Sequence, residues 1–259
     1  MRKYISIFEL FTRSTIYKIL PVLVAMGATQ IFMFRKAMLE WFPADSYHLD
    51  FQAIEYYTLE YMMDRSKSEI FLGIAFVAIT AILCWNGCNI GSKSNYTIQR
   101  LQVTEKKIFI MQSIYNTLCY VLLWGTQIGV FFIQSSLYEA RAGHLTNQTI
   151  FLAYYRNDFM HSVLPLEGTI RWLVNILIIL GCGTSAAMFS YLQRRGKRTL
   201  SLLIIIAFVL LGYVQELGEV LGFVIVVFIW VPVAFWLYRH LIQKKEVLEY
   251  FVQFYQYHF

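Results

Sequence analysis

Long apolar runs restrict the fold of this chain more than any other feature of its sequence. An apolar run of about 20 residues crosses a bilayer as a helix, because a helix bonds every backbone polar group internally. The last run, residues 199–240, is too long for one crossing, and Gln215, Glu216 and Glu219 interrupt its middle. We expect it to form two spans joined by a tight hairpin. The six expected spans cover residues 16–34, 70–85, 108–133, 172–192, 199–214 and 220–240.

The composition agrees with a chain that lies mostly in lipid. Of its 259 residues, 58% are hydrophobic and 15% are charged, whereas a soluble domain carries about 25% charged residues. The sequence therefore predicts an all-α integral membrane protein with one transmembrane domain over residues 1–259. Its net charge of +6 lies beside the apolar runs, where anionic lipid headgroups attract basic residues. We expect membrane lipid as a partner and no nucleic acid.

Two basic, amphipathic segments lie outside the expected spans. In residues 2–13, apolar and basic side chains fall on opposite sides of a helix, which is typical of a helix on the membrane surface. Residues 93–107 lie in the connection between the second and third spans. This connection is longer than the few residues that a direct link would need. This second segment is either another surface helix or a docking helix for a soluble partner. We favour docking, with Ile98 and Leu101 as its apolar anchors.

The distribution of basic residues predicts the orientation of the chain. Of the 22 lysines and arginines, 15 lie in the N-terminal segment, the connections around 87–107 and 193–198, and the C-terminal tail. Of the remaining 7, six lie in the longer connections 35–68 and 135–166, and the seventh is Arg171, just before the fourth expected span. Cytoplasmic loops carry the excess of basic residues. We therefore expect a multi-pass protein of the plasma membrane with both termini in the cytoplasm.

The third span carries the clearest polar pattern. Five hydrogen-bonding side chains fall within an arc of about 80° at about 100° per residue: Gln112, Asn116, Tyr120, Gln127 and Gln134. Such side chains are costly against lipid and should face protein or water. They form either a helix interface or the lining of a translocation path. In the fourth span, the small residues Gly181, Gly183, Ser185, Ala186 and Ala187 predict a close approach of helices.

Glu216 and Glu219 are the acidic residues of the last apolar run. Carboxylates at membrane depth are costly unless they are wet or paired. The simplest interpretation places both at the outer tip of the hairpin, in water. A gating or proton-coupling role and an intramembrane hydrolase role remain alternatives, although no histidine lies at membrane depth in the expected spans to assist hydrolysis; His240 is the last residue of the sixth span.

The sequence carries no motif for chemistry of its own. The phosphate-binding pattern GxxxxGK[ST] is absent, and so are the metal-binding spacings HExxH and CxxC. We expect no catalytic, cofactor or metal site in this chain. If ATP drives it, the ATP must act through another protein.

At these segments the chain resembles the ABC-2 type permeases, the membrane subunits of a class of ATP-binding-cassette exporters. The resemblance rests on the amphipathic segment before the first span, the six expected spans, and the run YTIQRLQVTEKKIFIMQSIYN from Tyr96 to Asn116. It implies separate ATPase subunits that hold ATP and Mg, and a second permease subunit, identical or related. It also implies a cytoplasmic coupling helix that contacts the ATPase through Tyr96, Ile98, Arg100, Leu101 and Val103.

The expected function is therefore that of an ABC transporter permease that exports a drug, peptide or lipid-like substrate. An ion-coupled secondary transporter is the first alternative and would need an ion site, for which Glu216 and Glu219 are the candidates. An intramembrane enzyme is the second.

The predicted orientation can be tested by thiol labelling. Single cysteines placed in 35–68 and in 135–166, in a cysteine-free background, should react with a membrane-impermeant reagent added to intact cells. A cysteine in the 194–198 turn should react only after the cells are opened. Labelling of that turn in intact cells would reverse the orientation.

Overall fold

The computed structural model describes residues 2–41, 58–87, 104–142, 146–166, 169–194, 206, 209 and 219–237. These residues form helices and short connections, and no strand occurs among them. The helices are α1 (Arg2–Trp41), α2 (Leu59–Ser66), α3 (Ser68–Gly87), α5 (Glu105–Ala142), α6 (Thr146–Arg156), α7 (Asp158–Val163), α8 (Thr169–Arg194) and α10 (Glu219–Leu237). The predicted all-helical class is confirmed for this part of the chain.

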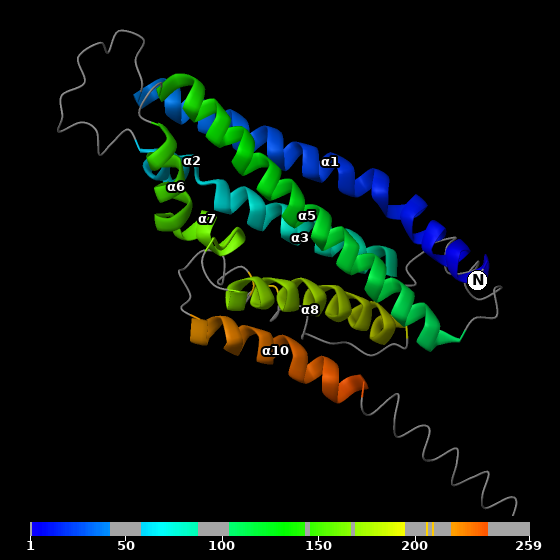
Figure 1. Cartoon of the computed structure of the whole chain (residues 1–259). Coiled ribbons are helices and arrows are strands. Elements are labelled where there is room, and N and C mark those ends of the chain that lie inside the picture. Colours follow the sequence, from blue (N-terminus) through cyan, green and yellow to red (C-terminus); the bar gives the residue numbers. More distant parts are fainter. Residues whose placement is uncertain are drawn as a thin grey trace, which may run out of the picture.

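The helix α5 is the centre of the bundle. It packs against α1, α3 and α8, and α10 packs on α8 (Figure 1). The start of α5 lies at the same end of the bundle as the start of α1 and the last turn of α8. Hydrogen bonds fix that arrangement, because Tyr115 of α5 bonds to Thr15 of α1, and Gln112 of α5 bonds to Arg194 of α8.

Four of the helices are long and apolar enough to cross a membrane. Their spans are Phe8–Glu40, Ser68–Trp85, Lys106–Arg141 and Thr169–Arg194. They contain the predicted spans 16–34, 70–85, 108–133 and 172–192. Large apolar side chains remain exposed along them; Val24 is 69% exposed and Phe32 67%. A surface of this kind suits lipid rather than water, so the fold is that of a helical membrane protein.

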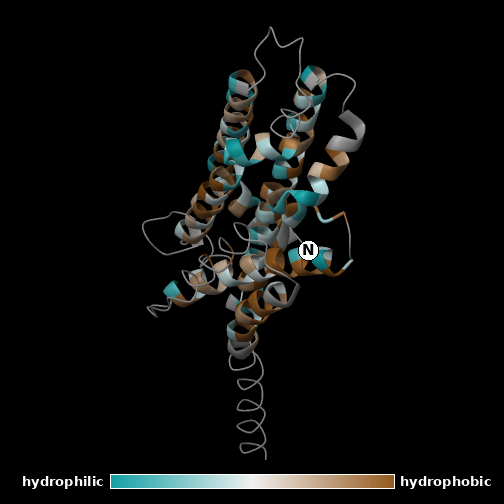
Figure 2. Cartoon of the chain, turned by 90° about the vertical axis from the view of Figure 1, so that its left-hand side faces the viewer, coloured by the Kyte–Doolittle hydropathy of each residue, from teal (hydrophilic) through white to brown (hydrophobic). Residues whose placement is uncertain are grey.

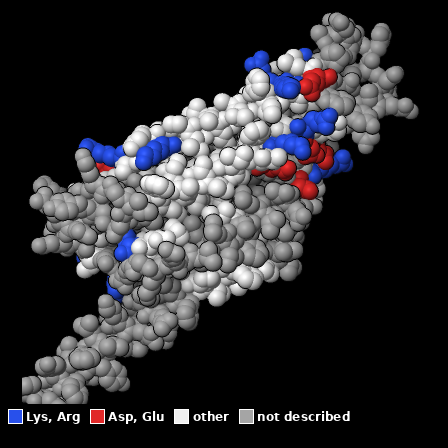
Figure 3. All heavy atoms as spheres, turned by 180° about the vertical axis from the view of Figure 1, so that it is seen from behind, with Lys and Arg blue, Asp and Glu red and all other residues white. Residues whose placement is uncertain are grey.

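The charged residues gather at the two ends of the bundle. In Figure 3, a broad belt with few charges separates an end with both acidic and basic residues from an end where basic residues predominate. Figure 2 shows hydrophobic residues along the long helices between these ends. The basic end includes the exposed Lys106 and Lys107 at the start of α5. Charged ends and an apolar middle are what a bilayer requires of a protein that spans it.

The structure describes only part of the last two predicted spans. The helix α10 lies where residues 220–240 were expected to span, and its apolar stretch Gly222–Ala234 is shorter than the four spans above. Of the predicted fifth span, 199–214, only residues 206 and 209 are described. The total of six spans therefore stays a prediction.

The N-terminal segment is not a separate surface helix. Residues 2–13 and 16–34, predicted as two segments, are both part of the single helix α1. The hydroxyl groups of Ser14 and Thr15 donate to the Phe11 carbonyl oxygen at 3.0 and 2.7 Å. These polar side chains therefore bond within the helix and do not interrupt it. The helix continues to Trp41 and occupies the beginning of the predicted outer loop 35–68.

The second predicted outer loop, 135–166, is also largely helical. The helix α5 continues to Ala142, and the short helices α6 and α7 follow. Together with α2 they form an end cap over the bundle. Asn157 holds this cap together, since its side-chain nitrogen donates to Asp64 Oδ1 at 2.7 Å and its side-chain oxygen accepts from the Met160 N–H at 3.0 Å. Sequence polarity suggested a loop because charged residues such as Arg156 and Asp158 are exposed here.

The small residues of the fourth span allow α8 to approach α5 closely, as predicted. A Cβ atom on Gly183 would lie 2.8 Å from the backbone nitrogen of Thr117 and 2.9 Å from its Cα. Both are backbone atoms of α5, so a rotamer change cannot relieve the contact. Only glycine therefore fits at this crossing without a shift of the two helices.

The substitution Gly183→Ala should lower the stability of the purified protein by about 1–3 kcal/mol, the usual cost of overpacking. The matched control is Gly125→Ala on α5, where an added Cβ meets no atom within 4 Å. Thermal unfolding of both variants in the same detergent measures the difference. Equal midpoints for the two variants would show that the α5–α8 crossing is loose.

Candidate functional site

The polar stripe predicted on the third span is buried inside this chain. The exposed fractions are 2% for Gln112, 1% for Asn116, 4% for Tyr120, and 0% for Gln127 and Gln134. The structure therefore brings all five residues onto the packed side of α5. Each one forms hydrogen bonds, and the bonds differ along the helix.

The first part of the stripe bonds to α8 and α3. Arg194 Nη2 donates to Gln112 Oε1 at 3.3 Å. The Asn116 amide satisfies both of its polar atoms when its oxygen accepts from the Ala187 N–H and its nitrogen donates to the Gln112 carbonyl, each at 3.3 Å. The Tyr120 hydroxyl shares a hydrogen bond of 2.8 Å with Thr80 Oγ1. These bonds connect α5 to both neighbouring helices.

The second part of the stripe bonds to α1 and to the start of α3. Gln30 of α1, which is fully buried, forms a reciprocal amide pair with Gln127, with N–O distances of 2.9 and 3.1 Å. Gln134 Nε2 donates to the Gln30 carbonyl at 3.4 Å and to Ser68 Oγ at 3.3 Å. Gln30, Ser68, Gln127 and Gln134 are called the glutamine junction below.

Sequence reasoning missed Gln30 and Ser68. Gln30 is a polar residue within the apolar run 16–34, which is the same signal that identified the stripe on α5. Ser68 begins α3 and has no such signal, because an exposed hydroxyl at a helix start is common. Only the packing of α1 and α3 on α5 brings the four residues of the junction together.

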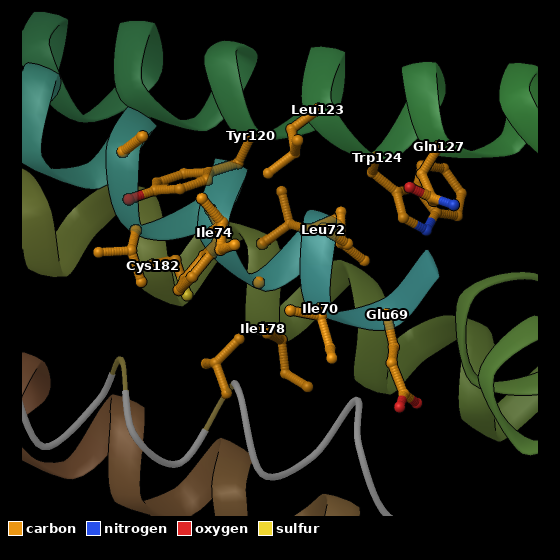
Figure 4. Close-up of a pocket in the computed structure, with 16 residues that line it drawn as sticks. Glu69, Ile70, Leu72, Ile74, Tyr120, Leu123, Trp124, Gln127, Ile178 and Cys182 are labelled. Atoms are coloured by element: carbon orange, nitrogen blue, oxygen red, sulfur yellow. The ribbon is translucent and has the colours of Figure 1, made fainter. Parts of the chain in front are cut away.

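An apolar cavity of about 570 Å³ lies beside the stripe. Its walls are residues of α3, α5 and α8, together with Val209. In Figure 4, Glu69 marks one end of the cavity and Cys182 lies toward the other, with Tyr120, Leu123 and Trp124 along the α5 wall. Two residues of the polar stripe, Tyr120 and Gln127, therefore also line this cavity. The sequence contained no signal for the cavity, because its walls are ordinary apolar residues from three separate helices.

The residues predicted to contact an ATPase lie outside the described residues. They are Tyr96, Ile98, Arg100, Leu101 and Val103. The described chain resumes at Thr104, whose carbonyl oxygen accepts from the N–H groups of Lys107 at 2.9 Å and Ile108 at 3.2 Å. Since these are the first bonds of α5, the predicted coupling segment leads into the central helix without an intervening linker.

The two acidic residues of the last apolar run are not placed in a site. Glu216 lies outside the described residues. Glu219 is the first residue of α10, and its side chain is not among those described. Their predicted place in the outer hairpin stays a prediction.

The end cap contains carboxyl groups whose pKa values are raised. Burial raises the pKa of Asp64, while its hydrogen bond from Asn157 acts in the opposite direction. Burial and the nearby Asp64 charge raise the pKa of Glu60. Among the described residues, no group of three or more His, Cys, Asp or Glu side chains is placed to hold a metal ion.

Fold and site together define a helical membrane protein with a polar interhelical network and an apolar internal cavity. No protein-family model, curated protein or solved structure matches this chain.

The amide pair of the glutamine junction can be tested with a double-mutant cycle. Gln127→Leu leaves the side-chain oxygen of Gln30, Oε1, unpaired in a buried site. The substitution should therefore cost about 1 kcal/mol of stability, as is usual for interhelical hydrogen bonds in membranes. Gln30→Leu combined with Gln127→Leu should cost less than the two single changes added together. Thermal or denaturant unfolding in detergent gives the coupling energy.

The control for this cycle is Thr126→Val, because the Thr126 hydroxyl is exposed and bonds only to Leu122 of its own helix. It should leave stability nearly unchanged. Strict additivity of the two glutamine changes would contradict the pairing.

Proposed function

We propose that this chain is the permease subunit of an ABC transporter of the ABC-2 type, driven by a separate ATPase subunit and acting as an exporter. The observation that carries the proposal is the continuity of α5. This helix begins within the predicted coupling segment 93–107, just after the predicted contact residues, extends over Glu105–Ala142, and contacts α1, α3 and α8 through buried polar groups. A force applied at its first turn would therefore reach three other helices.

Contacts near the first turns of α5 support this route of transmission. Tyr115 bonds through its hydroxyl to Thr15 of α1 and packs its ring against Phe8 and Phe11, with ring centroids 5.5 and 6.0 Å apart. On the other side, Gln112 contacts Arg194 at the end of α8. A rigid movement of the start of α5 would carry α1 and α8 with it, because these contacts lie within three turns of Thr104.

The polar stripe serves this proposal as a connection between helices rather than as a pore lining. Each of its side chains has at least one hydrogen-bond partner inside the same chain. One buried atom, Gln134 Oε1, has no partner among the described residues, so most but not all of the stripe is satisfied without water or substrate. A translocation path would then lie along the apolar cavity or between this chain and a second permease subunit. A surface that exposes side chains such as Val24 and Phe32 leaves room for such a subunit as well as for lipid.

The proposal places the basic end of the bundle on the cytoplasmic side of the plasma membrane, where the ATPase would bind. Basic residues at the start of α5 and in the last turn of α8 support this placement, because cytoplasmic loops are rich in lysine and arginine. ATP and Mg belong to the ATPase in this scheme, and this chain contributes no catalytic group.

The test is the substitution Leu101→Asp in the full complex. An apolar anchor buried at an interface contributes about 1.5–3 kcal/mol, so Leu101→Asp should release the ATPase or uncouple ATP hydrolysis from transport. Arg100→Ala should have a small effect, because a charge at the edge of an interface contributes about 0–1 kcal/mol. Co-purification of the ATPase and transport into inverted vesicles measure the two effects.

Normal ATPase binding and transport with Leu101→Asp would show that residues 93–107 are not the coupling contact. Transport that follows an ion gradient in the absence of any ATPase would favour the secondary-transporter alternative instead.

A further inference from the structure

The apolar cavity opens sideways onto the lipid-facing surface of the bundle. Ile70, Ile74 and Val77 of α3 line the cavity, and they are also 48%, 61% and 41% exposed. The cavity therefore reaches the surface along α3, within the apolar belt. Its volume of about 570 Å³ lies in the range of small-molecule sites, about 300–1,000 Å³. A molecule dissolved in the bilayer could enter it without crossing water.

The polar groups on the cavity wall already have partners within the protein. The Tyr120 hydroxyl bonds to Thr80 at 2.8 Å, and the indole N–H of Trp124 donates to the Val163 carbonyl at 3.0 Å. The Gln127 amide is paired with Gln30. The body of the cavity therefore offers shape and apolar contact but few free hydrogen-bonding groups. Its ligand should have an apolar body.

Glu69 is the exception at one end of the cavity (Figure 4). It belongs to the first turn of α3, at the border of the membrane span Ser68–Trp85. The described residues form no salt bridge or hydrogen bond with its carboxylate. Two charged groups act on it from nearby, Asp64 and Lys67, and their signs are opposite. The cavity therefore combines an apolar body with one acidic end at the level of the membrane interface.

We propose that this cavity binds a hydrophobic organic cation, with its apolar body between α3, α5 and α8 and its positive group beside Glu69. A cationic amphiphile in a bilayer already lies this way, with its charge at the interface and its apolar part in the hydrocarbon. A partly desolvated carboxylate attracts such a charge more strongly than water-exposed carboxylates do. The inference rests on the proposed function in one respect, because it names the substrate class of the permease.

The test is direct binding to the purified full chain in detergent, without ATPase or ATP. Tetraphenylphosphonium is the probe, and tetraphenylborate is its anionic counterpart of nearly the same size and shape. Saturable binding of the cation, with no saturable binding of the anion, is expected. Equal binding of both ions, or saturable binding of neither, would overturn the proposal.

Two pairs of variants locate the site. Glu69→Gln should weaken binding of tetraphenylphosphonium about tenfold, as the loss of one partly desolvated charge contact predicts. Glu60→Gln is the matched control, because Glu60 lies in the end cap and does not line the cavity. Ala78→Phe should fill part of the cavity and abolish binding, whereas Ala25→Phe on the exposed side of α1 should not. Elution as a single species in size-exclusion chromatography verifies that each variant is folded.

Unchanged affinity in Glu69→Gln would remove the role of the carboxylate, and unchanged affinity in Ala78→Phe would place the site elsewhere. A phospholipid that co-purifies with the wild-type chain but not with Ala78→Phe, without cation binding, would identify the cavity as a lipid site and overturn the proposal. Because no ATPase takes part, each of these failures is distinct from a failure of ATPase coupling.

Discussion

The structure depends on the need to satisfy polar side chains in the apolar middle of a membrane. The helix α5 carries five such side chains on one side, and none of them is more than 4% exposed. Against lipid each would lose its hydrogen bonds with water and gain none in return. Packing on α1, α3 and α8 resolves this conflict, since each neighbour supplies groups that bond to α5. The position of three helices follows from the polar residues of one.

Close packing then extends what the hydrogen bonds begin. In lipid, apolar residues do not drive helices together, so van der Waals contact and small residues determine how closely they approach. Gly183 permits α8 to contact the backbone of Thr117, near the Asn116 amide of the stripe. Polar pairing and close approach therefore occur at the same crossing. At the opposite end, Asn157 holds together the cap formed by α2, α6 and α7, and the bond from Trp124 to Val163 connects this cap to the bundle.

This arrangement gives the proposed function a mechanical basis. A long helix held at several levels is a stiff element, and its first turn directly follows the segment predicted to contact an ATPase. The cavity lies on the side of α5 that carries Tyr120 and Gln127, the residues through which α5 bonds to α3 and α1. Movement of α5 relative to α3 would change the shape of the cavity, because both helices contribute to its walls. Coupling segment, stripe and cavity are thus connected through one helix.

The sequence by itself determined the helical membrane class, the approximate positions of the four described spans, and the single polar side of α5. These features depend on local composition and on a period of 3.6 residues, which are readable without any partner. The sequence also indicated the close approach at Gly183, because small residues in an apolar helix have few other uses.

Only the tertiary structure decided what those features contact. It showed that α1 continues through Ser14 and Thr15, since a helix boundary depends on hydrogen bonds that no local pattern reveals. It paired Gln30 with Gln127, residues far apart in the chain. It also placed Glu69 at the end of a cavity whose walls come from three helices. A cavity and a cross-helix pair are relations between segments, and their energies depend on packing that one segment alone does not encode.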